Sequence, residues 1–208
     1  MDSLESIVIL VVIILFSAVI HEVMHGYAAY KLGDPTAKYA GRLTLNPISH
    51  IEPFGSIILP FLTVLSTGFY FGWAKPVPYN PYNLTKAPYW GEAIVAGAGP
   101  AANLAIALFF GLAIRSDLFP LANSLWTSVV MINVSLMLLN LLPIPPLDGS
   151  KILSAILPLR LRMQYDQLRN QLEYNPFLGF GIVMLFIIAF GSSFGSLVYM
   201  VSRAIAGV

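Results

Sequence analysis

Four long runs dominated by apolar side chains constrain this 208-residue chain more than any other feature of its sequence. They cover residues 4–32, 93–114, 118–147 and 174–202. A helix needs about 20 mostly apolar residues to cross the hydrocarbon core of a bilayer. The chain is 57% hydrophobic, whereas soluble domains contain roughly 45–50% apolar residues. We therefore expect an all-α polytopic membrane protein whose principal partner is the lipid bilayer.

A fifth uncharged stretch, residues 54–74, is harder to interpret because Gly55, Pro60 and Gly68 interrupt it. Such breaks are typical of re-entrant segments that lie against protein. A full fifth span is the alternative, and it would reverse the orientation of part of the chain. We expect four to five transmembrane helices, with residues 54–74 forming a re-entrant segment.

The placement of basic residues predicts the orientation of the chain in the membrane. Basic side chains gather in three connecting loops, and they are Lys31, Lys38, Arg42, Lys75, Lys86, Arg160, Arg162 and Arg169. Loops rich in Lys and Arg usually stay in the cytoplasm. We expect a multi-pass integral protein of a prokaryotic plasma membrane, with its active site toward the cytoplasmic side. A formal net charge of +1 gives no basic face for nucleic acid.

The connections between these spans contain weaker patterns. The stretches "GRLTLNP" (41–47) and "FGWAKPVPYNP" (71–81) have the alternation, prolines and glycines of short strands bounded by turns. They predict short membrane-associated β strands. Residues 157–172 carry leucines at helical spacing opposite charged residues, which indicates an amphipathic helix at the interface or an ordinary solvated connector. Nothing indicates a second domain, so residues 1–208 are expected to form a single membrane-embedded domain.

Ionisable residues interrupt the first apolar run in the stretch "HEVMH". His21 and His25 are four residues apart, so on a helix they share one face, with Glu22 beside them. The chain has no cysteine, so any metal must be held by His, Asp or Glu. Zinc suits two imidazoles, and ionisable residues inside a spanning helix are functional candidates by default. We expect one zinc ion here, with a third protein ligand still to be found.

Asp148, in "NLLPIPPLDGSKIL", is the candidate for that third ligand because it is the ionisable residue that stands out at membrane depth. The three prolines before it cannot continue a regular helix, and Gly149 allows a tight turn that can aim the carboxylate inward. The alternative is that Asp148 caps a helix from Ser150 onward. One carboxylate oxygen could also cap while the other ligates.

Three motifs together resemble those of a known family. They are "HEVMH" in the first span, "GPAAN" (99–103) in a middle span and "NLLPIPPLDG" (140–149) in a later one. In this order the chain resembles the site-2 protease family of intramembrane zinc metalloproteases. The chain has no room for PDZ or CBS domains, so it resembles a minimal form of that family.

The resemblance implies a function and a set of roles. The function would be hydrolysis of peptide bonds in or near transmembrane segments of membrane-protein substrates, known as regulated intramembrane proteolysis. It implies that His21, His25 and Asp148 bind zinc, that Glu22 is the general base, and that Asn140 helps to hold the substrate carbonyl or its oxyanion. The alternatives are a catalytically silent membrane scaffold and a metal or ion carrier of the same fold. The intact HExxH and aspartate argue against both.

Other polar residues have less specific signals. Asn103 matches the asparagine of the middle motif, which makes it a candidate for substrate binding, although we favour a hydrogen bond between helices. Asn133 has no motif and is expected to be a packing residue. His50 could support the site or anchor a loop, but we favour a polar pair with Glu52 at the interface.

Substrate binding poses a separate problem, because peptide bonds in a transmembrane helix are protected until the helix unwinds. An edge strand could hold the unwound peptide by β-addition, which supplies main-chain hydrogen bonds. The stretch "GWAKPVPYNP" is our candidate. It makes Trp73, Lys75 and Val77 expected substrate-binding residues.

Overall fold

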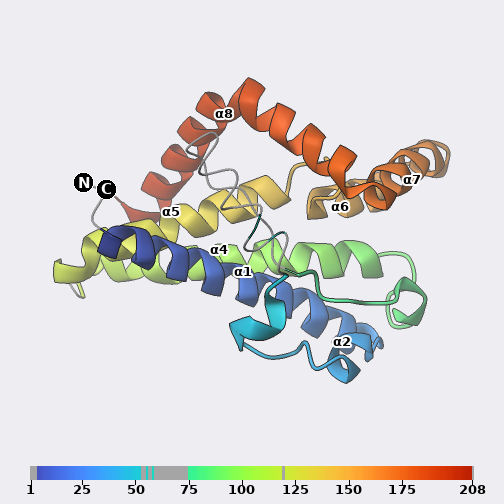
Figure 1. The fold of residues 1–208 in the computed structure, drawn as a ribbon, viewed down its shortest axis with the longest axis horizontal. Helices are drawn as coiled ribbons and strands as arrows, with labels where there is room; N and C mark the ends of the chain where they lie inside the picture. The colour runs from blue at the N-terminus through green and yellow to red at the C-terminus, as the bar shows by residue number, and fades with distance from the viewer. Residues whose placement is uncertain (1–3, 53–54, 56–57, 59–74, 119, 208) are drawn as a thin grey trace.

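The computed structural model describes residues 4–52, 55, 58, 75–118 and 120–207 (Figure 1). Within these residues the regular structure is helical, and four helices are long and apolar enough to cross a membrane. The spanning segments are Glu5–Leu32, Gly91–Arg115, Pro120–Asn140 and Phe177–Ala206. The expectation of an all-α membrane protein with four such helices is therefore confirmed for the described part of the chain.

Helix α4 (Gly91–Arg115) lies at the centre of the molecule. It packs against α1 (Leu4–Leu32), α5 (Asn123–Asn140), α6 (Asp148–Ile156) and α8 (Pro176–Ala206). Small and branched side chains fill the space between α4, α5 and α8, and they are Ala107, Ile114, Val130, Val134, Val198 and Ala206. Small residues let the helix backbones approach closely, which drives helix association in lipid. Figure 1 shows α1 beside α4, with α8 crossing above α5.

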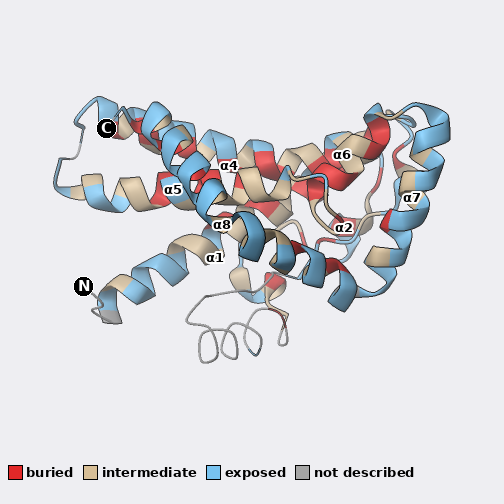
Figure 2. Cartoon of the chain, turned by 90° about the horizontal axis from the view of Figure 1, so that it is seen from above, coloured by how far each residue is buried: buried red, intermediate tan, exposed pale blue. Residues whose placement is uncertain are grey.

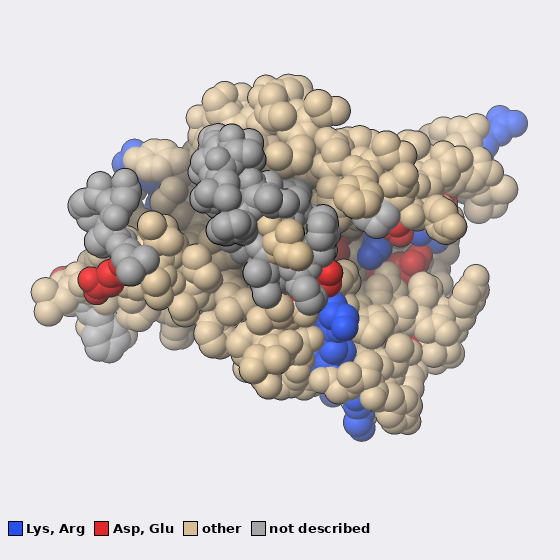
Figure 3. Space-filling view, in the orientation of Figure 1, with Lys and Arg blue, Asp and Glu red and all other residues tan. Residues whose placement is uncertain are grey.

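The outer faces of the long helices are apolar and exposed. On α8, the exposed fractions are 66% for Leu185 and 76% for Ile188. Figure 2 shows the same exposure along the outer sides of α1 and α8. Large exposed apolar surfaces are rare on soluble monomers. On the face that Figure 3 shows, most charged side chains gather toward the end of the molecule that carries α2 (Thr36–Tyr39), and much of the rest of that face is uncharged, which suits lipid.

Helix α7 (Leu159–Tyr174) forms over most of the expected amphipathic segment, but its charged face turns toward the protein. Arg169 is 8% exposed, and its Nη2 lies 3.9 Å from Oε2 of Glu92 on α4. Leu161 and Leu168 are about half exposed on the other side. An outward apolar face favours an interfacial helix over a solvated connector.

The third expected span, residues 118–147, is longer than the helix that forms. A 3-10 turn (Pro120–Ala122) leads into α5, which ends at Asn140. The segment from Leu141 to Leu147 follows as turns before α6 begins at Asp148. Prolines in this segment cannot donate main-chain hydrogen bonds, so the helix stops before them.

The expected β strands do not form among the described residues of 41–47 and 71–81. Residues 75–80 run as an extended loop in Figure 1, but they form no strand. The physical reason is that Pro76 and Pro78 have no N–H, and the amide of Val77 between them donates to the side chain of Glu22. The expected re-entrant segment, 54–74, lies outside the described residues apart from positions 55 and 58.

Candidate metal centre

Helix α1 brings the two expected imidazole ligands together one turn apart. His21 and His25 are 7% and 8% exposed, and their ring centroids lie 4.6 Å apart in an edge-to-face arrangement. Residues four positions apart on a helix share one face, so this pairing follows from local geometry. Glu22 is partly exposed beside them. The helix therefore presents two nitrogen ligands and one carboxylate near the same point.

Asp148 closes the group from a second helix. Its Oδ2 lies 3.1 Å from Nε2 of His21 and 3.3 Å from Nε2 of His25. Helix α6 begins at Asp148, its N-cap residue is Leu147, and no side chain caps it, so the capping alternative is wrong. Gly149 is helical and lies directly against the carbonyl of Leu141. Its missing side chain serves this close approach rather than a tight turn.

The donor set fits one zinc ion. The ligand atoms of His21, His25 and Asp148 all lie within 4.8 Å of one another, and all three residues are buried. Ligands about 2.0–2.1 Å from a tetrahedral zinc are roughly 3.3 Å apart, and the two distances from Asp148 Oδ2, 3.1 and 3.3 Å, agree with this spacing. Three protein ligands leave a fourth position for water, as a catalytic site requires.

Gly99 of α4 leaves the space that this centre needs. A Cβ atom built at Gly99 would lie 2.5 Å from Nε2 of His25 and 2.6 Å from Nε2 of His21. Any side chain there would occupy the position in front of both nitrogens. The sequence motif "GPAAN" contains this glycine but by itself predicts no role for it. A glycine within an apolar helix was the available signal, because glycine there often marks a close approach.

The ring nitrogens that face away from the centre are also held. His25 Nδ1 donates to the main-chain carbonyl of Val95 over 2.7 Å, and His21 Nδ1 donates to Asn103 Oδ1 over 2.6 Å. Zinc-binding histidines usually donate their other N–H to such a partner, which orients the ring. Asn103 is fully buried and joins α4 to α1, as in the hydrogen bond between helices that we favoured.

Comparison with known proteins identifies the family of this chain. The family description that matches, over residues 119–187, is "Peptidase family M50". A relative from Bacillus subtilis (strain 168), named "Putative zinc metalloprotease YwhC", is 36% identical over 193 residues, which cover 88% of this chain and 82% of the relative. The chain belongs to peptidase family M50. This confirms the expected membership of the site-2 protease family. The chain is therefore a zinc metallopeptidase embedded in a membrane.

Two further relatives are matched over only about half of their own length. A relative from Mycolicibacterium smegmatis is named "Putative zinc metalloprotease Rip2". It is 36% identical over 139 residues, which cover 65% of this chain and 52% of the relative. Rip2 of Mycobacterium tuberculosis is 34% identical over 138 residues, with the same two coverages. No solved structure matches the chain.

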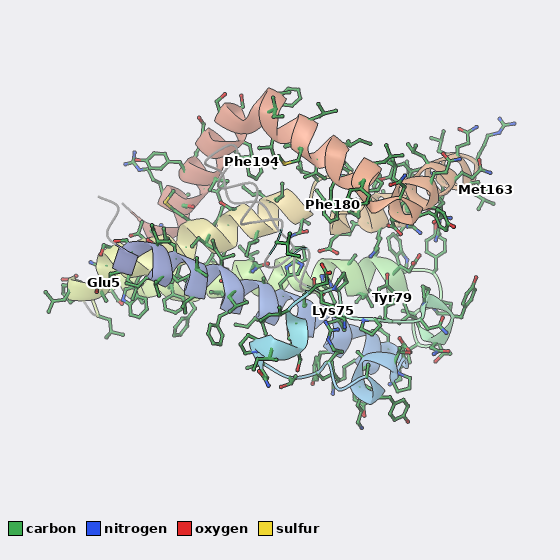
Figure 4. The ribbon with its side chains drawn as sticks, viewed as in Figure 1. Glu5, Lys75, Tyr79, Met163, Phe180 and Phe194 are labelled. Carbon is green, nitrogen blue, oxygen red and sulfur yellow. The ribbon has the colours of Figure 1, made fainter. Side chains whose placement is uncertain are left out.

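The general base expected of this M50 enzyme contacts a distant segment. Oε2 of Glu22 accepts a 2.9 Å hydrogen bond from the main-chain N–H of Val77. Lys75 is held nearby, because its N–H donates to the carbonyl of His50 and its own carbonyl accepts from Arg42. Figure 4 labels Lys75 and Tyr79, which lie along this segment near α1 and α4. Trp73 lies outside the described residues.

Two further polar residues of the M50 chain make local contacts. Asn140 is the last residue of α5, and its Nδ2 donates to the carbonyl of Leu136 over 3.0 Å. His50 is 1% exposed, and its Nε2 contacts the carbonyl of Thr44 at 2.9 Å. These contacts favour a loop-anchoring role for His50 over an interfacial pair with Glu52.

Charges near the candidate metal centre favour the ionised form of Asp148. Burial opposes ionisation, but the imidazoles of His21 and His25 beside the carboxylate outweigh it and hold the pKa of the Asp148 carboxyl below its ordinary value. One turn along α6, the ammonium of Lys151 lies 5.5 Å from the ring centre of Tyr79. Burial raises the pKa of the Tyr79 hydroxyl, which therefore stays neutral. A carboxylate with two imidazoles is a suitable set for a divalent cation.

Proposed function

We propose that this M50 enzyme cleaves peptide bonds in or near transmembrane segments of membrane-protein substrates. In this proposal His21, His25 and Asp148 hold one zinc ion, Glu22 is the general base, and residues 1–208 form a single catalytic domain. The observation that carries the proposal is that three buried ligand atoms converge, two of them from a helix apolar enough to span a membrane and the third from α6. A soluble substrate would not require the centre to lie among such helices.

The mechanism uses the geometry around Glu22. A zinc ion held by His21, His25 and Asp148 would polarise the scissile carbonyl and would lower the pKa of a bound water to about 7. Glu22 accepts a proton from the water whose oxygen forms the new bond to the carbonyl carbon, and donates it to the amine when the C–N bond breaks. The amide of Val77 occupies Oε2, which leaves Oε1 of Glu22 for this proton. The Asn140 amide is proposed to donate to the developing oxyanion.

We further propose that the substrate peptide lies along the extended segment Lys75–Asn80, with Trp73, Lys75 and Val77 contributing to binding. The support is the position of Val77 beside Glu22. The N–H groups of Lys75 and Val77 already donate within the protein, and the carbonyls of Lys75 and Pro76 accept from Arg42. Main-chain contacts with a substrate would therefore use the carbonyl groups from Val77 onward. Scrambling residues 73–79 should reduce cleavage and leave zinc content unchanged.

We also propose the orientation in the membrane that the sequence predicts. Basic loops at the α2 end of the molecule favour a cytoplasmic position for that end. His21 lies in the half of α1 nearer to that end, so the active site would face the cytoplasmic side of a prokaryotic plasma membrane. The bacterial sources of the relatives support such a membrane.

The decisive experiment uses the purified full chain in detergent or vesicles with a panel of single-span membrane proteins. We expect cleavage that a zinc chelator abolishes. Glu22→Gln should lose cleavage but retain one zinc ion, because the ligand atoms are untouched. Cleavage by Glu22→Gln at the wild-type rate would reject the proposed mechanism. A zinc-loaded wild type that cleaves nothing in the panel would favour a scaffold or carrier.

A further inference from the structure

A continuous row of buried polar side chains runs from His21 through three helices. His21 Nδ1 on α1 contacts Asn103 Oδ1 on α4 at 2.6 Å, and Asn103 Nδ2 contacts Asn133 Oδ1 on α5 at 2.9 Å. Asn133 Nδ2 then reaches Ser17 Oγ, back on α1, at 3.0 Å. Ser17 and His21 are 4% and 7% exposed, and both asparagines are fully buried. Residues of this kind in a spanning helix need hydrogen-bond partners, and here they supply one another.

Both amides in this row have one fixed orientation, which a main-chain carbonyl determines. Asn133 Nδ2 also lies 2.9 Å from the carbonyl oxygen of Val129 on its own helix. A carbonyl oxygen can only accept, so the Asn133 amide must turn its NH₂ group toward Val129 and its oxygen toward Asn103. The Asn103 amide must then offer its NH₂ group to Asn133, and its oxygen faces His21.

The consequence for His21 follows from the same rule. An amide oxygen can only accept, so Nδ1 of His21 must carry the proton. A neutral imidazole with its proton on Nδ1 has its lone pair on Nε2. Nε2 is the atom that lies 3.1 Å from Oδ2 of Asp148. The carbonyl of Val129 therefore determines, through two amides, which nitrogen His21 offers to the centre.

We propose that Asn133, acting through Asn103, is a positioning residue that fixes the tautomer and ring orientation of the zinc ligand His21. The inference rests on the proposed zinc centre and deepens it. His25 needs no such row, because its Nδ1 donates directly to the carbonyl of Val95. The two imidazoles are thus oriented by independent devices. Asn133 had been expected only to pack, since a single asparagine in an apolar run has no motif.

A purely structural role for Asn133 would place different requirements on the orientation of its amide. An asparagine that only links helices stabilises the bundle with its amide in either orientation. A positioning role requires one orientation, because a reversed Asn103 would offer its NH₂ group to Nδ1 of His21 and favour the proton on Nε2. Metal ligands must be unprotonated, so this reversal weakens metal binding without unfolding the protein. Zinc affinity and thermal stability therefore separate the two roles.

The test measures the zinc dissociation constant of the purified full chain by competition with a chromogenic chelator, together with helix content and thermal unfolding. Asn133→Leu removes the amide that fixes the orientation of Asn103. We expect zinc binding to weaken about 10–100-fold while helix content is retained. Ser17→Ala should leave zinc affinity unchanged, because the Val129 carbonyl still orients Asn133. Val134→Ala, at the neighbouring fully buried position, is the matched control: it should lower thermal stability but not zinc affinity.

The outcomes separate this inference from the proposed function. A wild type without bound zinc would reject both. Zinc in the wild type with equal affinity in Asn133→Leu would reject the positioning role alone, as would equal weakening by Val134→Ala. If Asn133→Leu does not fold, Asn133→Ala replaces it, because water that fills the space can donate as readily as accept. Wild-type zinc affinity in Asn133→Ala would also overturn the proposal.

Discussion

The main-chain N–H of Val77 donates a 2.9 Å hydrogen bond to the carboxylate of Glu22, which lies 55 positions earlier in the chain. Val77 is 6% exposed and packs against Gly26, one turn after Glu22 on α1. The extended segment that carries Val77 is therefore fixed against the helix that carries the proposed general base. Removing this N–H should affect the base more than the metal ligands.

Replacing Val77 by proline tests this connection. Val77→Pro removes the N–H, so Glu22 loses the contact that holds Oε2, and we expect a lower kcat with one zinc ion still bound. Val77→Ala is the control, because it keeps the N–H and loses only packing. Steady-state cleavage and zinc content measure the two effects. Equal activity of the proline and alanine variants would show that the hydrogen bond does not matter for turnover.

Adding a methyl group at Gly99 tests the space in front of the imidazoles. In Gly99→Ala the Cβ atom would collide with Nε2 of both His21 and His25, so we expect loss of zinc and of cleavage. Gly97→Ala on the same helix is the matched control, since a Cβ at Gly97 meets no atom within 4 Å. Metal content of the purified variants provides the measurement. A zinc-replete Gly99→Ala protein would contradict the proposed position of the metal.

Asp34 anchors the start of the loop after α1 and makes stability depend on pH. It is fully buried, and its carboxylate accepts hydrogen bonds from Thr36, Asn80 and Asn83. Burial raises its pKa, but these hydrogen bonds outweigh that effect and hold the pKa below the ordinary value of 3.8. A lowered pKa in the folded state stabilises the protein above pH 3.8, and this stabilisation is lost as pH falls through the folded-state pKa.

At pH 7 the Asp34→Asn variant should therefore have a lower thermal midpoint than the wild type. In acid the difference between the two midpoints should become smaller. An unsatisfied buried donor costs about 1–3 kcal/mol, and the Asn80 amide would face such a loss. Asp117→Asn, at an exposed carboxylate, is the control and should change little. Thermal unfolding between pH 7 and pH 3 follows the effect. A constant difference across that range would show that the charge of Asp34 is not responsible.

Arg169 holds the charged face of α7 against the protein. Its guanidinium lies 3.9 Å from Glu92 on α4, 3.5 Å from Asp166 and 3.8 Å from Glu173. Arg169→Gln removes this counter-charge from Glu92 and Glu173, whereas Asp166 keeps its ion pair with Arg162, so we expect α7 to open more often. The cost should stay below the roughly 3–5 kcal/mol of a fully buried pair, because the carboxylate side chains are about a quarter to a third exposed.

Hydrogen exchange of α7 measures this opening. Arg160→Gln, at an exposed arginine of the same helix, should leave the exchange of α7 unchanged. Faster exchange across α7 in Arg169→Gln alone would support the anchoring role. Identical protection in both variants would mean that the packing of α7, rather than the charge of Arg169, holds the helix.

Much of the architecture could be predicted from local patterns. The first helix spans Leu4–Leu32 as expected, because a long apolar run in lipid must satisfy its main-chain groups within a helix. The pairing of His21 with His25 followed from four-residue spacing alone. Asp148 was identified by elimination, since few ionisable residues lie at membrane depth, and it lies beside both imidazoles.

Among the described residues of 71–81 the expected strand does not form, partly because Pro76 and Pro78 have no N–H, and partly for a reason that sequence patterns do not contain. The alternation in "GWAKPVPYNP" predicted a strand, but a strand requires a neighbour that accepts from its N–H groups. The N–H groups of this segment donate instead to the carboxylate of Glu22 on α1, the main-chain carbonyl of His50 and the carboxylate of Asp34. Which of these groups would meet the segment depends on how α1, α4 and the loops pack.

The sequence by itself determined the lipid environment, the all-helical class and the chemical identity of the candidate ligands, because hydropathy, spacing and residue type are local properties. Only the tertiary structure decided that Gly99 faces the imidazoles, that Val77 holds Glu22, and that Asn133 directs His21 through Asn103. Each of these contacts joins residues on different helices or loops. Their geometry depends on helix packing, which no single stretch of sequence specifies.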